Sequence, residues 1–268
     1  MGLFSFLRKK DESDLRISSF ECSREGLTIR GTQYRPEGDK LPIAIVSHGF
    51  MANQQSVAQY AAALARMGWC AFTFDFCGGS VPGTGKSDGD TTRMSVLTEV
   101  RDLEAVMAYA RILPYTGDKL ILGGCSQGGF VSALTAAKHP LEVAGLVLFY
   151  PALCIPDDAR AGRMMFARFD PENIPQEFSC GPMKLGRCYA ADVIGMDPIT
   201  EIRGYPGPVL ILHGSKDRLV LPQYSRQAQA AYPNGELHII EGAGHGFGKR
   251  HDAIAIAHLK KFAGTVRD

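Results

Sequence analysis

The residues with the clearest chemical signature are Gly124, Ser126 and Gly128, which stand in the sequence GCSQGG. A serine hydroxyl is a weak nucleophile at neutral pH, so it needs a base that accepts its proton and a backbone that exposes it. The pattern G-x-S-x-G provides this exposure as a sharp turn between a strand and a helix, the nucleophile elbow, where glycines are needed because the chain is crowded. We therefore predict that Ser126 is a catalytic nucleophile.

The sequence on both sides of Ser126 fits such a turn. Residues 119–124 form a short apolar run typical of a buried parallel strand, and residues 130–138 favour a helix that ends before Pro140. A glycine-rich turn without chemistry is the alternative, but it does not require strand, turn and helix in this order. Cys125 is predicted to pack into the sheet, because the turn exposes its central residue and not the residue before it.

A serine nucleophile needs a histidine base and a carboxylate that orients the histidine. Residues 209–212 form a strand-like run that precedes Asp217, and residues 237–240 form another that precedes His245. The order serine, aspartate, histidine is the one that hydrolases with this turn use, although an aspartate after a strand can also serve only as a turn or N-cap residue. The other candidate histidines end different strands, lie within a strand or fall on the last predicted helix: His48, His213, His238, His251 and His258.

The negative oxygen that forms when serine attacks a carbonyl group needs hydrogen-bond donors, which are usually backbone N–H groups. We expect the N–H of Gln127, directly after the serine, and the N–H of Phe50, in the loop after a strand at residues 43–47. No H-E-x-x-H pattern or comparable ligand spacing occurs, so neither a metal nor another cofactor is expected.

The elements that position these residues alternate between strands and helices. Residues 15–22 and 27–34 predict an antiparallel hairpin, because apolar and polar residues alternate around a turn. Further strands are predicted at residues 43–47, 70–75, 119–124, 144–149, 209–212 and 237–240, and helices at 56–67, 95–112 and 130–138. The alternation predicts an α/β fold with a mostly parallel central sheet, an antiparallel N-terminal edge and helices on both faces. Functional groups gather at the carboxyl ends of the strands in such sheets.

Residues 151–204 interrupt this alternation with several prolines and no clear strand. An irregular segment of this length is more often a functional cap than a plain connection, so we interpret it as a lid over Ser126. A packing insertion that never contacts substrate is the alternative. The sequence thus predicts a single domain over residues 15–268 that contains this insertion, preceded by a flexible tail at residues 1–14.

The overall composition is that of an ordinary globular protein. The 29 basic and 28 acidic side chains give a formal net charge of +1, which favours a small-molecule substrate over nucleic acid as the partner. No run of residues is long and apolar enough to span a membrane. We expect a cytoplasmic location, because no signal-peptide pattern is evident and the seven cysteines lack C-x-x-C spacing. Homodimer formation is left open.

Five blocks of the sequence resemble the α/β-hydrolase superfamily, and within it the bacterial cinnamoyl (feruloyl) esterases, over residues 18–265. The blocks are SHGF at 47–50, FDF at 74–76 with SDGD at 87–90, CSQGG at 125–129, HGSKD at 213–217 and EGAGHGF at 241–247. The loop at residues 77–86 is longer than the turn usual in that family. We expect this longer loop to reshape the acyl pocket.

The resemblance also implies a substrate class. In those esterases the lid carries an aspartate and a tyrosine near the phenolic end of the substrate, and the similar blocks at residues 150–158 and 184–189 place Asp158 and Tyr189 in these roles. The implied activity is that of a serine carboxylesterase that hydrolyses small esters, including hydroxycinnamate (feruloyl) esters, through an acyl-enzyme. A serine peptidase or amidase of the same fold is the alternative. A non-catalytic binding module fits less well, because no member of the serine, histidine and aspartate set is missing.

Overall fold

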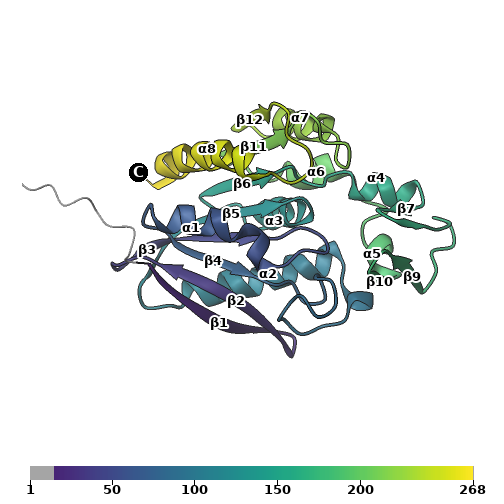
Figure 1. Ribbon diagram of the computed structural model, residues 1–268, viewed down its shortest axis with the longest axis horizontal. Coiled ribbons are helices and arrows are strands. Elements are labelled where there is room, and N and C mark those ends of the chain that lie inside the picture. Colours follow the sequence, from purple (N-terminus) through teal and green to yellow (C-terminus); the bar gives the residue numbers. More distant parts are fainter. Residues whose placement is uncertain (1–14, 268) are drawn as a thin grey trace, which may run out of the picture.

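The computed structural model describes residues 15–267, so the predicted tail at residues 1–14 lies outside the described residues. An eight-stranded sheet forms the centre of the molecule, with the strand order β1-β2-β4-β3-β5-β6-β11-β12 (Figure 1). Its strands are β1 (Arg16–Arg24), β2 (Leu27–Arg35), β3 (Leu41–Ser47), β4 (Cys70–Phe74), β5 (Thr116–Cys125), β6 (Gly145–Phe149), β11 (Val209–Gly214) and β12 (Gly235–Ile240). Within this sheet, β4, β3, β5, β6, β11 and β12 pair in parallel, whereas β2 pairs antiparallel with both β1 and β4.

The hairpin of β1 and β2 forms the antiparallel edge, as predicted. Its two-residue turn consists of Glu25 and Gly26, with φ angles of 52° and 84°. Two consecutive positive φ angles are characteristic of the type I′ turn, whose twist matches that of the two strands it joins. The pattern of apolar and polar residues around this turn therefore predicts both the hairpin and its place in the sheet.

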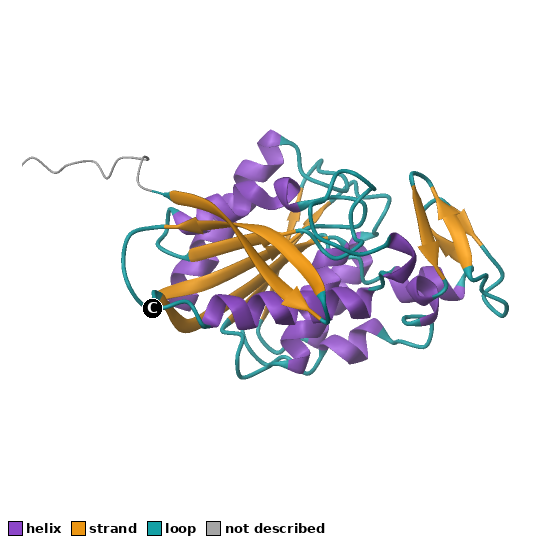
Figure 2. Cartoon of the chain, turned by 90° about the horizontal axis from the view of Figure 1, so that it is seen from below, coloured by secondary structure: helices purple, strands orange, loops and turns teal. Residues whose placement is uncertain are grey.

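Helices cover both faces of the sheet (Figure 2). They are α1 (Ala58–Ala65), α2 (Val96–Arg111), α3 (Gln127–Lys138), α7 (Pro222–Ala231) and α8 (Lys249–Arg267), with 3-10 turns η1 (Gln54–Val57) and η2 (Thr91–Arg93). One face packs against α1 and α8 and buries Trp69 and Tyr60, and the other packs against α2, α3 and α7 and buries Phe72 and Phe130. Burial of apolar side chains on both faces explains why the central strands are almost continuously apolar. The predicted fold class is confirmed.

The insertion at residues 151–204 lies at one end of the sheet (Figures 1 and 2). It consists of the short helices α4 (Ile155–Arg160), α5 (Cys188–Ala191) and α6 (Pro198–Ile202) and the strand pairs β7 (Arg163–Met164) with β8 (Ala167–Arg168) and β9 (Glu177–Cys180) with β10 (Met183–Gly186). The prediction that this segment contains no strand is wrong. Strands of two to four residues are too short for their alternation to be distinguished from chance.

The insertion begins directly beside the turn that carries Ser126. The N–H of Ala152 donates to the carbonyl oxygen of Ser126 at 2.9 Å, and the N–H of Ser126 donates to the carbonyl oxygen of Phe149 at the same distance. Because β3, β5, β6, β11 and β12 run parallel, the loops after them meet at this edge of the sheet. Within residues 15–267, no helix has the combination of length and apolarity needed to cross a membrane.

Candidate active site

Ser126 occupies the turn between β5 and α3 with φ of 53° and ψ of −119°, a backbone conformation that residues other than glycine rarely adopt. The turn is crowded. A Cβ atom on Gly124 would lie 2.1 Å from the carbonyl oxygen of Gly128, and one on Gly128 would lie 2.3 Å from the carbonyl oxygen of His48. Only a glycine fits at either position, which is the physical reason for the pattern in the sequence.

The structure brings Ser126, His245 and Asp217 into one chain of hydrogen bonds. Oγ of Ser126 lies 2.9 Å from Nε2 of His245, and Nδ1 of the same ring lies 2.8 Å from Oδ2 of Asp217. Because an ionised carboxylate can only accept, the imidazole proton is assigned to Nδ1, and Nε2 is left to accept the proton of the serine hydroxyl. This is the arrangement that serine activation requires.

Several donors hold the Asp217 carboxylate in its buried position. The N–H groups of Leu219 and Val220 donate to Oδ1 at 2.9 and 3.0 Å, and Nε2 of His213 lies 3.2 Å from Oδ2. Burial raises the pKa of this carboxyl group, but the hydrogen bonds from His213 and His245 outweigh burial and lower the pKa below its usual value. Asp217 is therefore ionised at neutral pH and can stabilise a protonated His245. Its contacts with Leu219 and Val220 show that it also serves as a turn residue.

Two of the competing histidines have structural partners. His213 is buried, with Nδ1 2.7 Å from Oγ of Ser225 and Nε2 2.9 Å from the carbonyl oxygen of Val220. His48 is also buried, and its Nε2 accepts a hydrogen bond from the N–H of Phe76 at 3.1 Å. Burial lowers the pKa of His48, so this ring is neutral and accepts the Phe76 N–H. Of the histidines in residues 15–267, His245 is the one that hydrogen-bonds to Ser126.

Cys125 belongs to the core, as predicted. It is 5% exposed and contributes to the apolar cluster on the α1 and α8 face. Burial raises the pKa of its thiol to about 12. The thiol is therefore protonated at neutral pH and lacks the thiolate form that a cysteine nucleophile needs.

The loop after β3 lies directly against Ser126. A Cβ atom on Gly49 would be 3.1 Å from Cβ of Ser126 and 3.3 Å from the carbonyl oxygen of Cys125. Among residues 15–267, no acceptor pairs with the N–H of Phe50 or with the N–H of Gln127. Both predicted donors thus lie next to the serine with an unused N–H group. Gln127 is also the first residue of α3, and the N-terminal end of a helix attracts negative charge.

The side chain of Gln127 is buried and is held at both ends of its amide group. Nε2 donates to Oε2 of Glu99 at 2.8 Å, and Oε1 accepts from the hydroxyl of Tyr189 at 2.6 Å. Burial raises the pKa of Glu99 well above its usual value, and the hydrogen bond from Gln127 opposes this only in part. The sequence did not point to Glu99. It lies on the apolar face of α2, three residues after Val96 and four before Leu103, and a glutamate at such a buried position could have indicated a special role.

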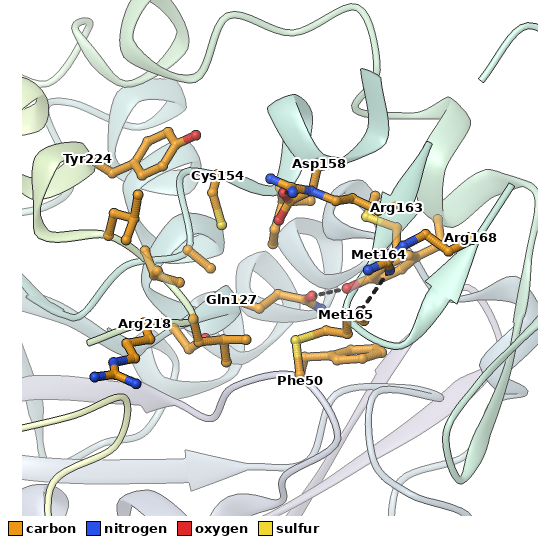
Figure 3. Close-up of a pocket in the computed structure, with 17 residues that line it drawn as sticks. Phe50, Gln127, Cys154, Asp158, Arg163, Met164, Met165, Arg168, Arg218 and Tyr224 are labelled. Carbon is orange, nitrogen blue, oxygen red and sulfur yellow. Dashed lines mark hydrogen bonds and ion pairs between the residues drawn. The ribbon is translucent and has the colours of Figure 1, made fainter. Parts of the chain in front are cut away.

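A cavity of about 480 Å³ opens at Ser126, within the size range of small-ligand sites (Figure 3). Loops at the sheet end and parts of the insertion line it together, with Phe50, Ser126, Gln127, Asp158, Tyr189 and Tyr224 among the lining residues. Both residues implied to bind substrate are thus present. Asp158, however, is paired with Nε of Arg163 at 2.9 Å, and the Tyr189 hydroxyl already donates to Gln127.

Arginine side chains set the charge of this cavity. Arg163, Arg168 and Arg218 contribute to its lining, and Asp158 is the one carboxylate among the described lining residues. Arg163 and Arg168 lie directly opposite each other in the β7–β8 pair, and Figure 3 shows Arg218 on the far side of the cavity from them. The sequence did not mark Arg163 and Arg168, because exposed residues on very short strands leave no periodic pattern, and Arg218 lies in a loop after β11.

The long loop after β4 does not line this cavity directly, although Ser80 forms a bridge with Met51, the residue after Phe50. Residues 77–86 are all described, and none of them lines the Ser126 cavity. Residues between 76 and 91 instead border a separate cavity of about 350 Å³. The loop is held against β2 and β4, because the Asp75 carboxylate accepts the N–H of Lys86 at 2.8 Å and the Asp88 carboxylate accepts the N–H of Thr28 at 2.9 Å.

Comparisons with known proteins agree with this architecture. A family model described as serine aminopeptidase, S33 (Hydrolase_4) matches residues 39–176, which is just over half of the chain. A monoglyceride lipase from Homo sapiens is 28% identical over 243 residues, covering 79% of this chain and 78% of the relative. A monoacylglycerol lipase from Mycolicibacterium smegmatis is 23% identical over 241 residues, covering 80% of this chain and 84% of the relative.

Among solved structures, Est1E from Butyrivibrio proteoclasticus, with ferulic acid bound, superposes with a TM-score of 0.84. The two chains are 27% identical, and the superposition covers 91% of this chain and 97% of that one. These similarities confirm the predicted fold and the resemblance to esterases that the sequence blocks indicate.

Proposed function

The chain belongs to the Hydrolase_4 family (serine aminopeptidase, S33) and is a serine hydrolase of carboxylic esters, and we propose that Ser126, His245 and Asp217 are its catalytic triad. The observation that carries this proposal is the continuous hydrogen-bond chain from Oγ of Ser126 through His245 to Asp217, together with a cavity of suitable size that Ser126 lines. The strained backbone of Ser126 supports it, because such strain persists where it serves a function.

The proposed reaction proceeds by acyl transfer in two steps. Oγ of Ser126 attacks the ester carbonyl carbon while Nε2 of His245 takes the hydroxyl proton, and the resulting imidazolium is stabilised by the ionised Asp217. The tetrahedral intermediate collapses when His245 returns that proton to the leaving alcohol, which yields the acyl-enzyme. Water then attacks the acyl-enzyme with the same histidine as base, and Ser126 and a free carboxylic acid are released.

The oxyanion of each tetrahedral intermediate is proposed to bind the N–H groups of Phe50 and Gln127. Their unused N–H groups and their position beside Ser126 support this role. Donors of this kind act strongly because they are in place before charge develops, and loss of one costs on the order of a hundredfold or more in kcat.

We propose the insertion at residues 151–204 as a lid that shapes the acyl pocket, and hydroxycinnamate esters as the specific substrate class. The ferulic acid bound in the similar Est1E structure supports the second point, as do Asp158 and Tyr189 in the lining of the cavity. The Asp158 carboxylate retains lone pairs beside its contact with Arg163, so it can accept a hydrogen bond from a phenolic hydroxyl. Simple short-chain esters are the broader substrate class.

The experiment that tests the triad is the Ser126→Ala substitution. We expect the variant to lose at least about a thousandfold in kcat for 4-nitrophenyl acetate and to lose labelling by a fluorophosphonate probe, because the nucleophile is gone. Ser132→Ala, which removes a buried hydroxyl further along α3, is a matched control and should retain labelling. A folded Ser126→Ala variant with wild-type turnover would refute the assignment.

The family description names a second candidate function, that of a serine aminopeptidase. An aminopeptidase must bind the protonated amino group of its substrate, whereas three arginines and a single, already paired aspartate line this cavity. Repulsion between like charges in a partly desolvated site opposes such a substrate. Esters should therefore be cleaved faster than amino-terminal anilides of the same acyl size, and the reverse ranking would favour the peptidase.

A further inference from the structure

Tyr189, on α5 of the insertion, contacts the side chains of both residues whose N–H groups are proposed to bind the oxyanion. Its hydroxyl donates to Oε1 of Gln127 at 2.6 Å, and its ring packs on the ring of Phe50 with the centroids 5.2 Å apart. In Figure 3, Phe50 and Gln127 approach the same part of the cavity. We infer that Tyr189 is a positioning residue that holds the two oxyanion donors in place and makes their geometry depend on the position of the insertion.

The first step of the argument concerns Gln127. Its amide group is fixed on one side by Tyr189 and on the other by Glu99 at 2.8 Å, and all three side chains are buried. With both ends hydrogen-bonded, the amide cannot rotate without leaving a buried donor or acceptor unpaired, which is costly. The side chain therefore anchors the backbone of the same residue, whose N–H must point at the oxyanion.

The second step concerns Phe50. The loop around it is irregular, and the next residue, Met51, has a positive φ of 63°. The backbone around Phe50 is tied by the hydrogen bond from the N–H of Ala52 to the carbonyl oxygen of Gly49 at 3.1 Å and by the bridge between Met51 and Ser80. Neither contact fixes the Phe50 side chain, so packing against its ring adds to the definition of the loop. The ring of Phe50 is partly buried, and Tyr189 supplies one face of its surroundings. Catalysis is sensitive to this packing, because oxyanion donors act only within a narrow range of distances.

The third step concerns the insertion itself. Asp192, three residues after Tyr189, accepts a hydrogen bond from Oγ of Ser95 at 2.5 Å, and Sγ of Cys188 lies 3.5 Å from the carbonyl oxygen of Met94. These contacts fasten α5 to the start of α2, the helix that also carries Glu99. A movement of the insertion away from α2 would withdraw Tyr189 from Phe50 and Gln127 together.

This role rests on the proposed function, yet it predicts something that substrate binding by Tyr189 does not. A residue that only contacts the phenolic end of a hydroxycinnamate affects KM for that substrate and leaves short esters unchanged. A residue that positions the oxyanion donors affects the transition state of every ester. Its substitution therefore lowers kcat for short and long substrates alike and leaves KM unchanged.

The test compares Tyr189→Phe with wild type on 4-nitrophenyl acetate and methyl ferulate. Tyr189→Phe keeps the ring against Phe50 and removes only the hydrogen bond to Gln127. We expect kcat to fall on the order of tenfold for both esters, with KM within about twofold of wild type. The matched control is Tyr205→Phe, which removes a buried tyrosine hydroxyl that donates to the carbonyl oxygen of Val143 outside the cavity. It should keep the wild-type kcat.

A second variant keeps the inference testable if Tyr189→Phe does not fold. Gln127→Met retains the backbone N–H and removes both side-chain hydrogen bonds, so it should show the same loss of kcat on both esters. Affinity for a trifluoromethyl ketone, which forms an oxyanion on Ser126, should fall in parallel. If wild type cleaves neither ester, the proposed function fails. If wild type is active and Tyr189→Phe only raises KM for methyl ferulate, or leaves both esters unchanged, the positioning role is wrong.

Discussion

The loops at the carboxyl ends of the strands and the insertion at residues 151–204 line the same cavity, but they are specified in different ways. In the loop that carries Ser126, backbone constraints decide the geometry: a side chain on Gly124 or Gly128 would collide with main-chain oxygens, and Ser126 is held at a positive φ. Where the insertion reaches the cavity, side-chain contacts such as Tyr189 with Gln127 and Asp158 with Arg163 decide it, and its own sterically required glycines, Gly162 and Gly186, do not line the cavity. The comparison indicates that the backbone places the nucleophile, whereas side-chain contacts place the residues of the insertion that reach the cavity.

The largest difference between the two regions is expected for their aspartates. Asp217→Asn should lower kcat for 4-nitrophenyl acetate by about 10⁴, because an amide no longer favours the Nδ1-protonated form of His245 and cannot stabilise its charge. Asp158→Asn should lower kcat by less than about tenfold, because its carboxylate faces the cavity and Arg163 and makes no contact with His245. Steady-state kinetics on both variants measures the contrast, and losses of equal size would contradict it.

A second contrast compares glycines in the two regions by their effect on folding. Gly124→Ala should lower the free energy of unfolding by about 3 kcal/mol, because its Cβ would lie 2.1 Å from a backbone oxygen that cannot move freely. Gly195→Ala lies in the insertion, where no atom is within 4 Å of the added carbon, and should change it by less than about 0.5 kcal/mol. Urea denaturation of both variants provides the measurement, and similar midpoints would show that the elbow tolerates a side chain.

These constraints also explain what the sequence could predict. A steric requirement for glycine at Gly124 and Gly128 leaves a readable pattern, and the loops carrying Asp217 and His245 follow strands with clear apolar runs. The sheet, its antiparallel edge and the set of residues around Ser126 could therefore be predicted. The two short strand pairs of the insertion could not, because two to four residues give no measurable period.

Contacts between distant segments that no motif marks were also beyond the sequence. Glu99, Gln127 and Tyr189 meet only after α2, the elbow and the insertion have packed together, and no local pattern links them. The same holds for the loop at residues 77–86, whose length suggested an effect on the acyl pocket. Its hydrogen bonds with Asp75 and with Arg30 of β2 hold it at the border of a different cavity.

The smallest expected effect is a dependence of stability on pH at Glu99, whose side chain hydrogen-bonds to Gln127 and so lies where the two regions meet. Burial raises the pKa of Glu99 well above its usual value, so the folded protein holds this proton more tightly than the unfolded chain does. The stability from protonated Glu99 is fully present below the pKa of the unfolded chain and is lost as pH rises through the folded-state pKa. Glu99→Gln keeps a neutral side chain at every pH. Its Tm relative to wild type should therefore rise by a few degrees between pH 5 and pH 9.

Glu104, on the same helix, provides the opposite case as a control. Burial raises the pKa of Glu104, but its hydrogen bonds with Lys138 and His139 outweigh burial and lower the pKa below its usual value. The stability from ionised Glu104 is present above the pKa of the unfolded chain and is lost as pH falls through the folded-state pKa. Glu104→Gln should therefore have a lower Tm than wild type at pH 7, and the difference should shrink toward pH 3. If Glu99→Gln instead behaves like Glu104→Gln, Glu99 is ionised in the folded protein. Gln127 would then be held by a charged carboxylate, and the conclusion that neutral groups join Glu99, Gln127 and Tyr189 would be wrong.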